Sequence, residues 1–273
     1  MTQGQGFGKR SRRHVKVEET SRWVFNCMAD VYDARPAYPL PLVDALVEFA
    51  GKVGSRVCDL GAGIGHLALP LAKRGLEVTA VEPALMMLER LRVLAHLEGL
   101  GIRTVHAAAE ALPIDSSSVD LVLIADALHF IDTERAAREI ARVLVPGGAI
   151  ALMTCEFTPT PYMREVVRLM QESAPRRPRK VVSRRAQLSG IAKIPLLDEQ
   201  RFYDETPVSP EELDRILATI SFIGPAMNLE RTKEFRAKLH GLPLPAIWSR
   251  TFILRTGRRR VVGCKSIDNM GSF

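Results

Sequence analysis

The chain contains little cysteine and no long hydrophobic run. Its four cysteines, Cys27, Cys58, Cys155 and Cys264, have neither metal-ligand spacing nor the density of a disulfide framework. No apolar segment reaches membrane-spanning length, and the opening MTQGQGFGKRSRRHVK is polar and basic without the apolar core of a signal peptide. These absences predict a protein of the reducing cytoplasm, with no metal site and no membrane partner.

Basic residues outnumber acidic residues, and the formal net charge is +7. Part of the excess lies in two clusters, Lys9, Arg10, Arg12, Arg13 and Lys16 near the start and Arg176, Arg177, Arg179, Lys180, Arg184 and Arg185 in the second half. Single-stranded nucleic-acid sites interleave aromatic with basic residues, and neither cluster does so. We therefore expect residues 1–20 to be a flexible basic arm and expect no nucleic-acid partner.

Short apolar segments alternate with segments of helical periodicity through the first half of the chain. This pattern predicts strands at 56–60, 77–81, 102–106, 120–125 and 149–154, and helices at 64–74, 84–97 and 133–144, the last of them stopping at the Pro-Gly-Gly of 146–148. Near-continuous apolar strands joined by helices indicate a parallel sheet covered on both faces. The expected fold is α/β, a doubly wound, mostly parallel, seven-stranded sheet of Rossmann-like type.

The flanking segments are expected to form a helical cap. Helices are predicted at 21–33 and 40–51, and a helix followed by a basic loop from about residue 156. Two final strands are expected near 202–207 and 246–257, with helices at 209–240 between them. The predicted organisation is therefore a core of 21–155 and 202–258, a cap of 156–201 and 209–240 over the site, and a tail of 259–273.

Three glycines, Gly61, Gly63 and Gly65, follow the first predicted strand in VCDLGAGIGHLALPLAKRG. In a doubly wound sheet, the ligand binds at the carboxyl ends of the strands. A dinucleotide fingerprint would require G-x-G-x-x-G, and His66 occupies the position of its third glycine. A phosphate-binding P-loop would end in Gly-Lys-Ser/Thr, which is missing here. A ligand without phosphate, such as S-adenosylmethionine, suits this open backbone better.

An acid at the end of the second predicted strand supports this interpretation. Glu82 closes EVTAVE, and a carboxylate can accept hydrogen bonds from both hydroxyls of a ribose. Glu82 alone could equally be an ordinary strand-end residue. The combination of Glu82 with Asp59 and three glycines at this spacing favours a binding role.

These segments resemble the class I S-adenosylmethionine-dependent methyltransferases, and most of all the small-molecule group called type 11, related to trans-aconitate and ubiquinone-pathway enzymes. The resemblance extends from about Asp30 to Arg255. It rests on the glycine segment with VTAVEPA, on AAAEALPIDSSSVDLVLIADALHF, on EIARVLVPGGAIALMT and on VYDARPAYP. It implies an enzyme that binds S-adenosylmethionine, releases S-adenosylhomocysteine and methylates a small molecule, with an anionic or secondary metabolite as a candidate acceptor.

The resemblance also assigns roles to individual residues. Those expected to bind the cofactor are Tyr32 and Arg35 at the carboxylate of the methionine portion, Asp59, Gly61, Ala62 and Gly63 along that portion, Glu82 at the ribose, Pro83, Ala109 and Glu110 around the adenine, and Ala125 beneath the sulfonium. Many relatives carry an aspartate for the adenine amino group where this chain has Ala108. Glu110 or backbone atoms would have to supply that contact.

Methyl transfer requires a base only for acceptors that carry a proton to be removed. His129, just past the fourth predicted strand, is the candidate catalytic residue, either as that base or as a wall of the acceptor pocket. Asp126 and Glu156 are further candidates. The apolar residues expected to line the pocket are Phe157, Tyr162, Met163, Leu169, Phe222, Ile223 and Met227. An RNA or protein methyltransferase that uses the basic segments, a nicotinamide-dependent dehydrogenase and a non-catalytic cofactor-binding module remain as alternatives.

Overall fold

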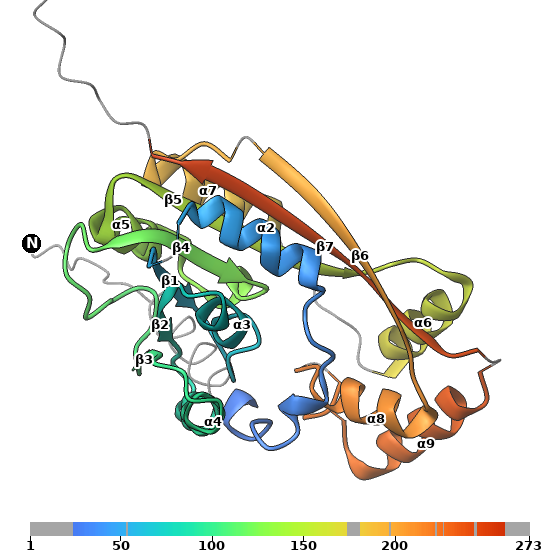
Figure 1. Cartoon of the computed structure of the whole chain (residues 1–273). Helices are drawn as coiled ribbons and strands as arrows, with labels where there is room; N and C mark the ends of the chain where they lie inside the picture. Colours follow the sequence, from blue (N-terminus) through green and yellow to red (C-terminus); the bar gives the residue numbers. More distant parts are fainter. Residues whose placement is uncertain are drawn as a thin grey trace, which may run out of the picture.

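The computed structural model describes residues 24–52, 54–173, 181–196, 198–221, 223–225, 227–242 and 245–259. The predicted arm of 1–20 and nearly all of the predicted tail of 259–273 lie outside these residues. The described part forms one seven-stranded sheet in the order β3-β2-β1-β4-β5-β7-β6, which confirms the doubly wound prediction (Figure 1). Its strands are β1 (Arg56–Leu60), β2 (Glu77–Val81), β3 (Arg103–Val105), β4 (Val119–Ala125), β5 (Leu144–Phe157), β6 (Asp198–Pro207) and β7 (Ile247–Arg258).

The first five strands run parallel, and β7 and β6 are added antiparallel at one edge. Alternate side chains of the strands enter two different cores, as the period of two in a strand requires. Val122 and Ile124 of β4 pack in one core with α5 (Thr133–Val143) and α7 (Val181–Ala192). Leu121 and Leu123 pack in the other core with α2 (Leu40–Ala50), α3 (Ala68–Lys73) and α4 (Leu85–Leu97). Helices therefore cover both faces of the sheet.

The remaining helices gather at one end of the long strands β5, β6 and β7 (Figure 1). This cap consists of α6 (Pro161–Ser173), α8 (Pro210–Ala218) and α9 (Leu229–His240), which share a core of their own with Trp248 of β7. The sequence positions these helices through their caps. Ser209 and Glu212 form a reciprocal capping box at the start of α8, and the side chain of Asn228 caps α9.

Several predicted boundaries are wrong for identifiable reasons. Within the predicted helix 21–33, only residues 24–26 are α-helical among those described, and Tyr32–Ala34 form a short 3-10 helix, η1. The helix predicted at 64–74 begins at Ala68, because Gly63 and Gly65 adopt left-handed backbone angles that a helix cannot contain. Local glycine geometry therefore overrides the apolar periodicity in this segment.

Two further differences concern β5 and α7. The helix α5 ends at Val143 and β5 starts directly at Leu144, so the Pro-Gly-Gly of 146–148 lies at an irregularity inside the strand and does not form the predicted separate turn. Residues 181–192, for which the sequence analysis predicts no element, form α7. This helix packs against α5 through Leu188 and Ala192, which lie in the same core as Ile140.

Candidate functional site

A cavity of about 1010 Å³ opens at the carboxyl ends of β1, β2, β4 and β5 and extends beneath the cap. All the residues that the sequence predicts for the cofactor or for catalysis line it: Tyr32, Arg35, Asp59, Gly61, Ala62, Gly63, Glu82, Pro83, Ala109, Glu110, Ala125 and His129. The fold thus brings together segments that are separated by almost one hundred residues. Their individual roles remain to be tested.

The glycine loop after β1 is held against the end of β2. The backbone N–H groups of Gly61 and Ala62 both donate to the carbonyl of Val81, at 2.8 and 3.1 Å. Gly61 has a φ of +77°, and a Cβ there would lie 2.6 Å from the Cβ of Ala127. Only glycine fits at this position, and its bare backbone forms part of the cavity wall.

The other two glycines have different surroundings. Gly63 faces the cavity, and a Cβ there would lie 3.9 Å from the ring of Tyr32. Gly65 faces away, where a Cβ would meet Leu91 of α4 at 3.0 Å and Leu69 at 3.2 Å. Gly65 therefore allows α3 and α4 to pack closely.

Glu82 fixes this loop through its carboxylate. Its Oε2 accepts from the N–H of Gly63 at 2.9 Å, and its Oε1 accepts from the N–H of Ala84 at 2.8 Å. The side chain is buried, yet it forms part of the cavity wall. The carboxylate of Glu82 therefore joins the loop after β1 to the start of α4 at the edge of the cavity.

Asp59, at the end of β1, is a buried acid in the same wall. Its Oδ1 atom has no hydrogen-bond partner among the described residues. Burial, and after it the nearby negative charge of Glu82, raises the pKa of Asp59 to about 7. The site therefore holds an acid whose charged form lacks a compensating cation.

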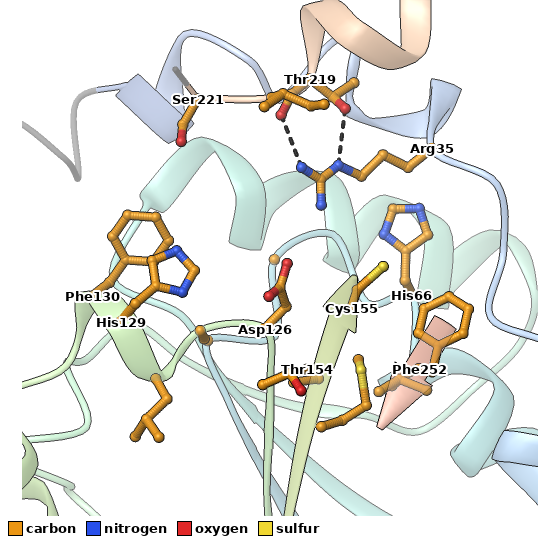
Figure 2. Close-up of a pocket in the computed structure, with 18 of the residues that line it drawn as sticks. Arg35, His66, Asp126, His129, Phe130, Thr154, Cys155, Thr219, Ser221 and Phe252 are labelled. Atoms are coloured by element: carbon orange, nitrogen blue, oxygen red, sulfur yellow. Dashed lines mark hydrogen bonds between the residues drawn. The ribbon is translucent and has the colours of Figure 1, made fainter. Parts of the chain in front are cut away.

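Arg35 directly follows η1, and its side chain reaches Thr219 at the end of the cap helix α8. Its Nε donates to the Oγ1 of Thr219 at 2.9 Å, and its Nη2 donates to the carbonyl of Thr219 at 3.1 Å. The guanidinium carbon also lies 4.6 Å from the centre of the Tyr32 ring. Figure 2 shows both hydrogen bonds and shows the third nitrogen directed into the cavity, toward Asp126.

The surroundings keep Arg35 charged although it is half-buried. Burial opposes the charge, but the neighbouring Tyr32 and Asp126 outweigh it, so the pKa of Arg35 is raised. His66 lies in the same region, with its ring centre 5.8 Å from that of Tyr32. Burial and the positive charges of Arg35 and Arg250 lower the pKa of His66 to about 4. His66 is therefore neutral near pH 7.

The expected adenine side is formed by backbone and small side chains. Ala107, Ala108 and Ala109 line the cavity there. One carboxylate oxygen of Glu110 accepts from the N–H of Asp132 at 2.7 Å, so only part of its acceptor capacity is available to a ligand. Nε2 of His106 lies 3.1 Å from the carbonyl of Pro83, and His106 is not among the residues that line the cavity.

His129 and Asp126 enter the cavity from the segment after β4. His129 belongs to a short 3-10 helix, Leu128–Phe130, and its ring centre lies 4.0 Å from that of Phe130. Asp126 has a φ of +48°, a strained angle for a side chain of this type, and its N–H donates to the carbonyl of Met153 at 2.9 Å. Such strain is typical of functional positions.

The cap half of the cavity corrects part of the sequence analysis. Of the apolar residues predicted to line it, Phe157 and Met163 do so. Leu169 and Ile223 instead form the core of the cap, Met227 packs against that core, Tyr162 lines a separate shallow groove and Phe222 lies outside the described residues. Leu169 and Ile223 have no polar group to satisfy, so burial among the cap helices stabilises them better than exposure to a cavity.

Other cavity residues were not predicted at all: Tyr38, Thr154, Cys155, Arg164, Arg168, Thr219, Ser221, Trp248 and Phe252. Most of them lie on β5, β7 and the cap helices, where no motif in the sequence distinguishes them. The Oγ1 of Thr154 and the Nε1 of Trp248 are buried and have no hydrogen-bond partner among the described residues. Unsatisfied polar atoms in a cavity wall indicate that a polar ligand belongs there.

The described residues were also compared with the requirements of a metal site and of a membrane-spanning helix. They contain no cluster of histidine, cysteine or acidic residues that could hold a metal ion. Nor do they include a helix with the length and apolar character needed to cross a bilayer.

Comparison with known proteins gives a consistent result. Residues 58–152 match a family described as a methyltransferase domain. A protein of Mycobacterium tuberculosis, named an uncharacterized methyltransferase, is 44% identical over 119 residues, which are 44% of this chain and 46% of that protein. The demethylmenaquinone methyltransferase of Thermus thermophilus is 41% identical over 122 residues, which are 44% of this chain and 53% of that protein. These matches thus span about half the length of each relative.

The crystal structure of the YcgJ protein from Bacillus subtilis has the same fold. It superposes with a TM-score of 0.57 at 23% identity and covers 80% of this chain and 97% of that one. The residues that match the methyltransferase domain, 58–152, include most of β1, the glycine loop, β2 and β4, which build the part of the cavity that the sequence analysis assigned to a cofactor.

Proposed function

We propose that the chain is a class I S-adenosylmethionine-dependent methyltransferase, which transfers a methyl group from S-adenosylmethionine to a small-molecule acceptor. The observation that carries this proposal is the single cavity. It joins the glycine loop and Glu82 at one end to the cap residues Met163 and Trp248 at the other. One enclosed space can hold donor and acceptor together and exclude water, which is most of what methyl transfer requires.

The residues at the first end fit the cofactor chemically. The unpartnered Oδ1 of Asp59 suits the positive charges of the methionine portion. The backbone at Gly61 and Gly63 offers a surface without side chains. Glu82 lies on the cavity wall at the end of β2, where a carboxylate can accept from the two ribose hydroxyls.

The other residues follow the same assignment. Tyr32 and Arg35 would bind the carboxylate of the methionine portion, where a guanidinium is the natural partner. Pro83, Ala109 and Glu110 would enclose the adenine ring, and Ala125 would lie beneath the reacting centre. All of these positions lie on the cavity wall.

When bound, S-adenosylmethionine supplies an activated methyl group, so the chain has to position the acceptor and accept any proton that it releases. His129 is the candidate for that proton, and its place after β4 on the cavity wall supports this role. His129→Phe keeps a ring that can contact Phe130 but removes the proton acceptor. A base role predicts loss of turnover in this variant, whereas a wall role predicts retention.

Three cations, Arg164, Arg168 and Arg185, line the acceptor half of the cavity. They could stabilise a negative charge on the acceptor. Arg185 is the member of the second basic cluster whose side chain is described. Burial and the neighbouring Arg255 lower the pKa of Arg185, a destabilisation that an anion would relieve. We therefore include a carboxylate- or phosphate-bearing metabolite as the acceptor class. Arg185→Gln should raise the KM for such an acceptor and leave cofactor binding unchanged.

Calorimetric titration with S-adenosylhomocysteine, with NAD as the comparison ligand, tests the cofactor class. We expect S-adenosylhomocysteine to bind to the wild type, to lose affinity in Glu82→Ala and to retain it in Glu77→Ala, which alters an exposed acid at the other end of β2. Binding of NAD alone would favour a dehydrogenase. Binding of S-adenosylhomocysteine without turnover of any metabolite, RNA or protein substrate would favour a non-catalytic module.

A further inference from the structure

Arg35 is held in place by three contacts, two of which come from one residue of the cap. Thr219 follows the last turn of α8 and is completely buried. It offers two acceptors to the guanidinium, its hydroxyl at 2.9 Å and its carbonyl at 3.1 Å. The ring of Tyr32 lies against the guanidinium as the third contact.

The hydroxyl of Thr219 has a defined direction. It donates to the carbonyl of Ile216 at 2.6 Å, so its lone pairs remain for the Nε of Arg35. A continuous chain of hydrogen bonds therefore runs from Arg35 through Thr219 to the last turn of α8. The carbonyl end of a helix also carries partial negative charge, which favours a cation at this place.

This arrangement leaves one nitrogen of Arg35 directed into the cavity (Figure 2). We propose that Thr219 is a positioning residue, which holds Arg35 in the orientation that binds the carboxylate of the cofactor's methionine portion. The inference rests on the proposed function. It also assigns the cap a part in cofactor binding, because the residue that orients Arg35 belongs to the cap and not to the sheet.

The same end of α8 contributes Ile216, Ile220 and Ser221 to the cavity wall. An acceptor that contacts these residues therefore contacts the segment that holds Arg35. Affinity for the cofactor and affinity for the acceptor become coupled through Thr219, and such coupling is reciprocal.

Two ligands separate this role from a general structural one. S-adenosylhomocysteine carries the carboxylate, whereas 5′-methylthioadenosine has the adenosine and the thioether without the amino-acid portion. In Thr219→Val, we expect S-adenosylhomocysteine to bind about 10-fold more weakly, the effect of one lost hydrogen bond to a charged group. The affinity for 5′-methylthioadenosine should stay at the wild-type value, which also shows that the variant is folded.

Three further variants sharpen the test. Thr219→Ser keeps the hydroxyl and should restore binding of S-adenosylhomocysteine. In an Arg35→Met background, Thr219→Val should cause no additional loss. Thr251→Val is the matched control, because it removes another buried threonine hydroxyl, which contacts Thr158 at 2.7 Å, and it should leave both affinities unchanged.

The outcomes are distinguishable. Equal weakening of both ligands by Thr219→Val, or weakening of neither, would overturn the positioning role while the proposed function stands. If the wild type binds neither ligand, the proposed function itself fails, and this inference fails with it.

Discussion

Glu82 and Gly63 are joined by a hydrogen bond of 2.9 Å from the backbone of the glycine to the carboxylate, so the acid that ends β2 fixes the loop that follows β1. The other oxygen of Glu82 accepts from Ala84 at the start of α4. Glu82 thus has a structural task in addition to its proposed contact with the ribose. A change at this position should affect stability even without any ligand.

The first prediction concerns Glu82→Gln. A glutamine has one acceptor oxygen, whereas both backbone N–H groups require an acceptor, so one buried donor loses its partner. We expect the free energy of unfolding to fall by about 1–3 kcal/mol in urea titrations without ligand. Glu77→Gln is the control and should change it little. Equal stability of the two variants would contradict the structural task.

The second prediction concerns Gly61→Ala. The alanine Cβ would be forced to within 2.6 Å of Ala127 at a φ of +77°. We expect a loss of stability of about 2–4 kcal/mol, from overpacking together with the left-handed backbone angle. Gly51→Ala has a φ of +98° and no atom within 4 Å of the added carbon, so it measures the cost of the backbone angle alone. Chemical denaturation of both variants isolates the clash.

The third prediction is the pH dependence of cofactor binding. Because burial raises the pKa of Asp59 to about 7, this acid is largely protonated below neutrality in the free protein. A ligand with a sulfonium and an ammonium group favours the ionised form. Affinity for S-adenosylmethionine should therefore fall as the pH decreases below 7, by up to ~10-fold per pH unit. Titrations between pH 5.5 and 8.5 test this, and Asp59→Asn should abolish the dependence.

The fourth prediction is that two buried groups change stability with pH in opposite directions. The pKa of Asp59 is about 7 in the folded state against a usual 3.8, so its contribution falls as the pH rises between these values. The pKa of His66 is about 4 against a usual 6.5, so its contribution increases as the pH rises through that range. In the wild type, the two effects oppose each other between pH 4 and 6.5.

Single variants expose each of these contributions. The ligand-free stability of His66→Gln should decrease as the pH rises from 4 to 6.5, and that of Asp59→Asn should increase. Urea denaturation at several pH values measures both slopes. Slopes of the same sign in the two variants would show that other groups dominate the pH dependence.

The residues predicted for the first half of the candidate site line one cavity, because the pattern that identified them is local. The glycines, Asp59 and Glu82 lie at strand ends, where hydrophobic periodicity and a glycine pattern are visible in the sequence. The doubly wound sheet was predicted from the alternation of strands and helices with right-handed crossovers, whereas the strand order comes from the structure. The same pattern failed at the start of α3, where left-handed glycines delay the helix to Ala68.

The cap half could not be predicted because its contacts join distant segments. Arg35 and Thr219 are separated by 184 positions, and neither carries a sequence signal of the other. Leu169 and Ile223 are apolar, and the sequence could not show whether such residues face the cavity or the core of the cap. Helix α7 was not predicted, and its position depends on the packing of Leu188 in the same core as Ile140 of α5.

The last prediction concerns Arg250 and Asp204, an ion pair between β7 and β6. The side chain of Arg250 is only 8% exposed. Besides Asp204, it donates to the carbonyls of Pro36 and Ala37, at 3.1 and 2.9 Å, and so fixes the segment that carries Arg35. Asp204→Ala leaves a buried charge without its partner, and we expect a loss of about 3–5 kcal/mol. The exposed pair of Arg56 and Asp120 supplies the control, since Asp120→Ala should cost about 1 kcal/mol or less.

This ion pair should also influence the ligand, because a loosened segment no longer holds Arg35 against Thr219. S-adenosylhomocysteine should bind more weakly to Asp204→Ala at a temperature where the variant remains folded, while 5′-methylthioadenosine binds as before. Loss of stability with both affinities intact would limit the ion pair to a structural role. Selective loss of the ligand that carries the carboxylate would show that the segment containing residues 35–37 is held from two sides, by Thr219 and by Arg250, and that both attachments support the cofactor site.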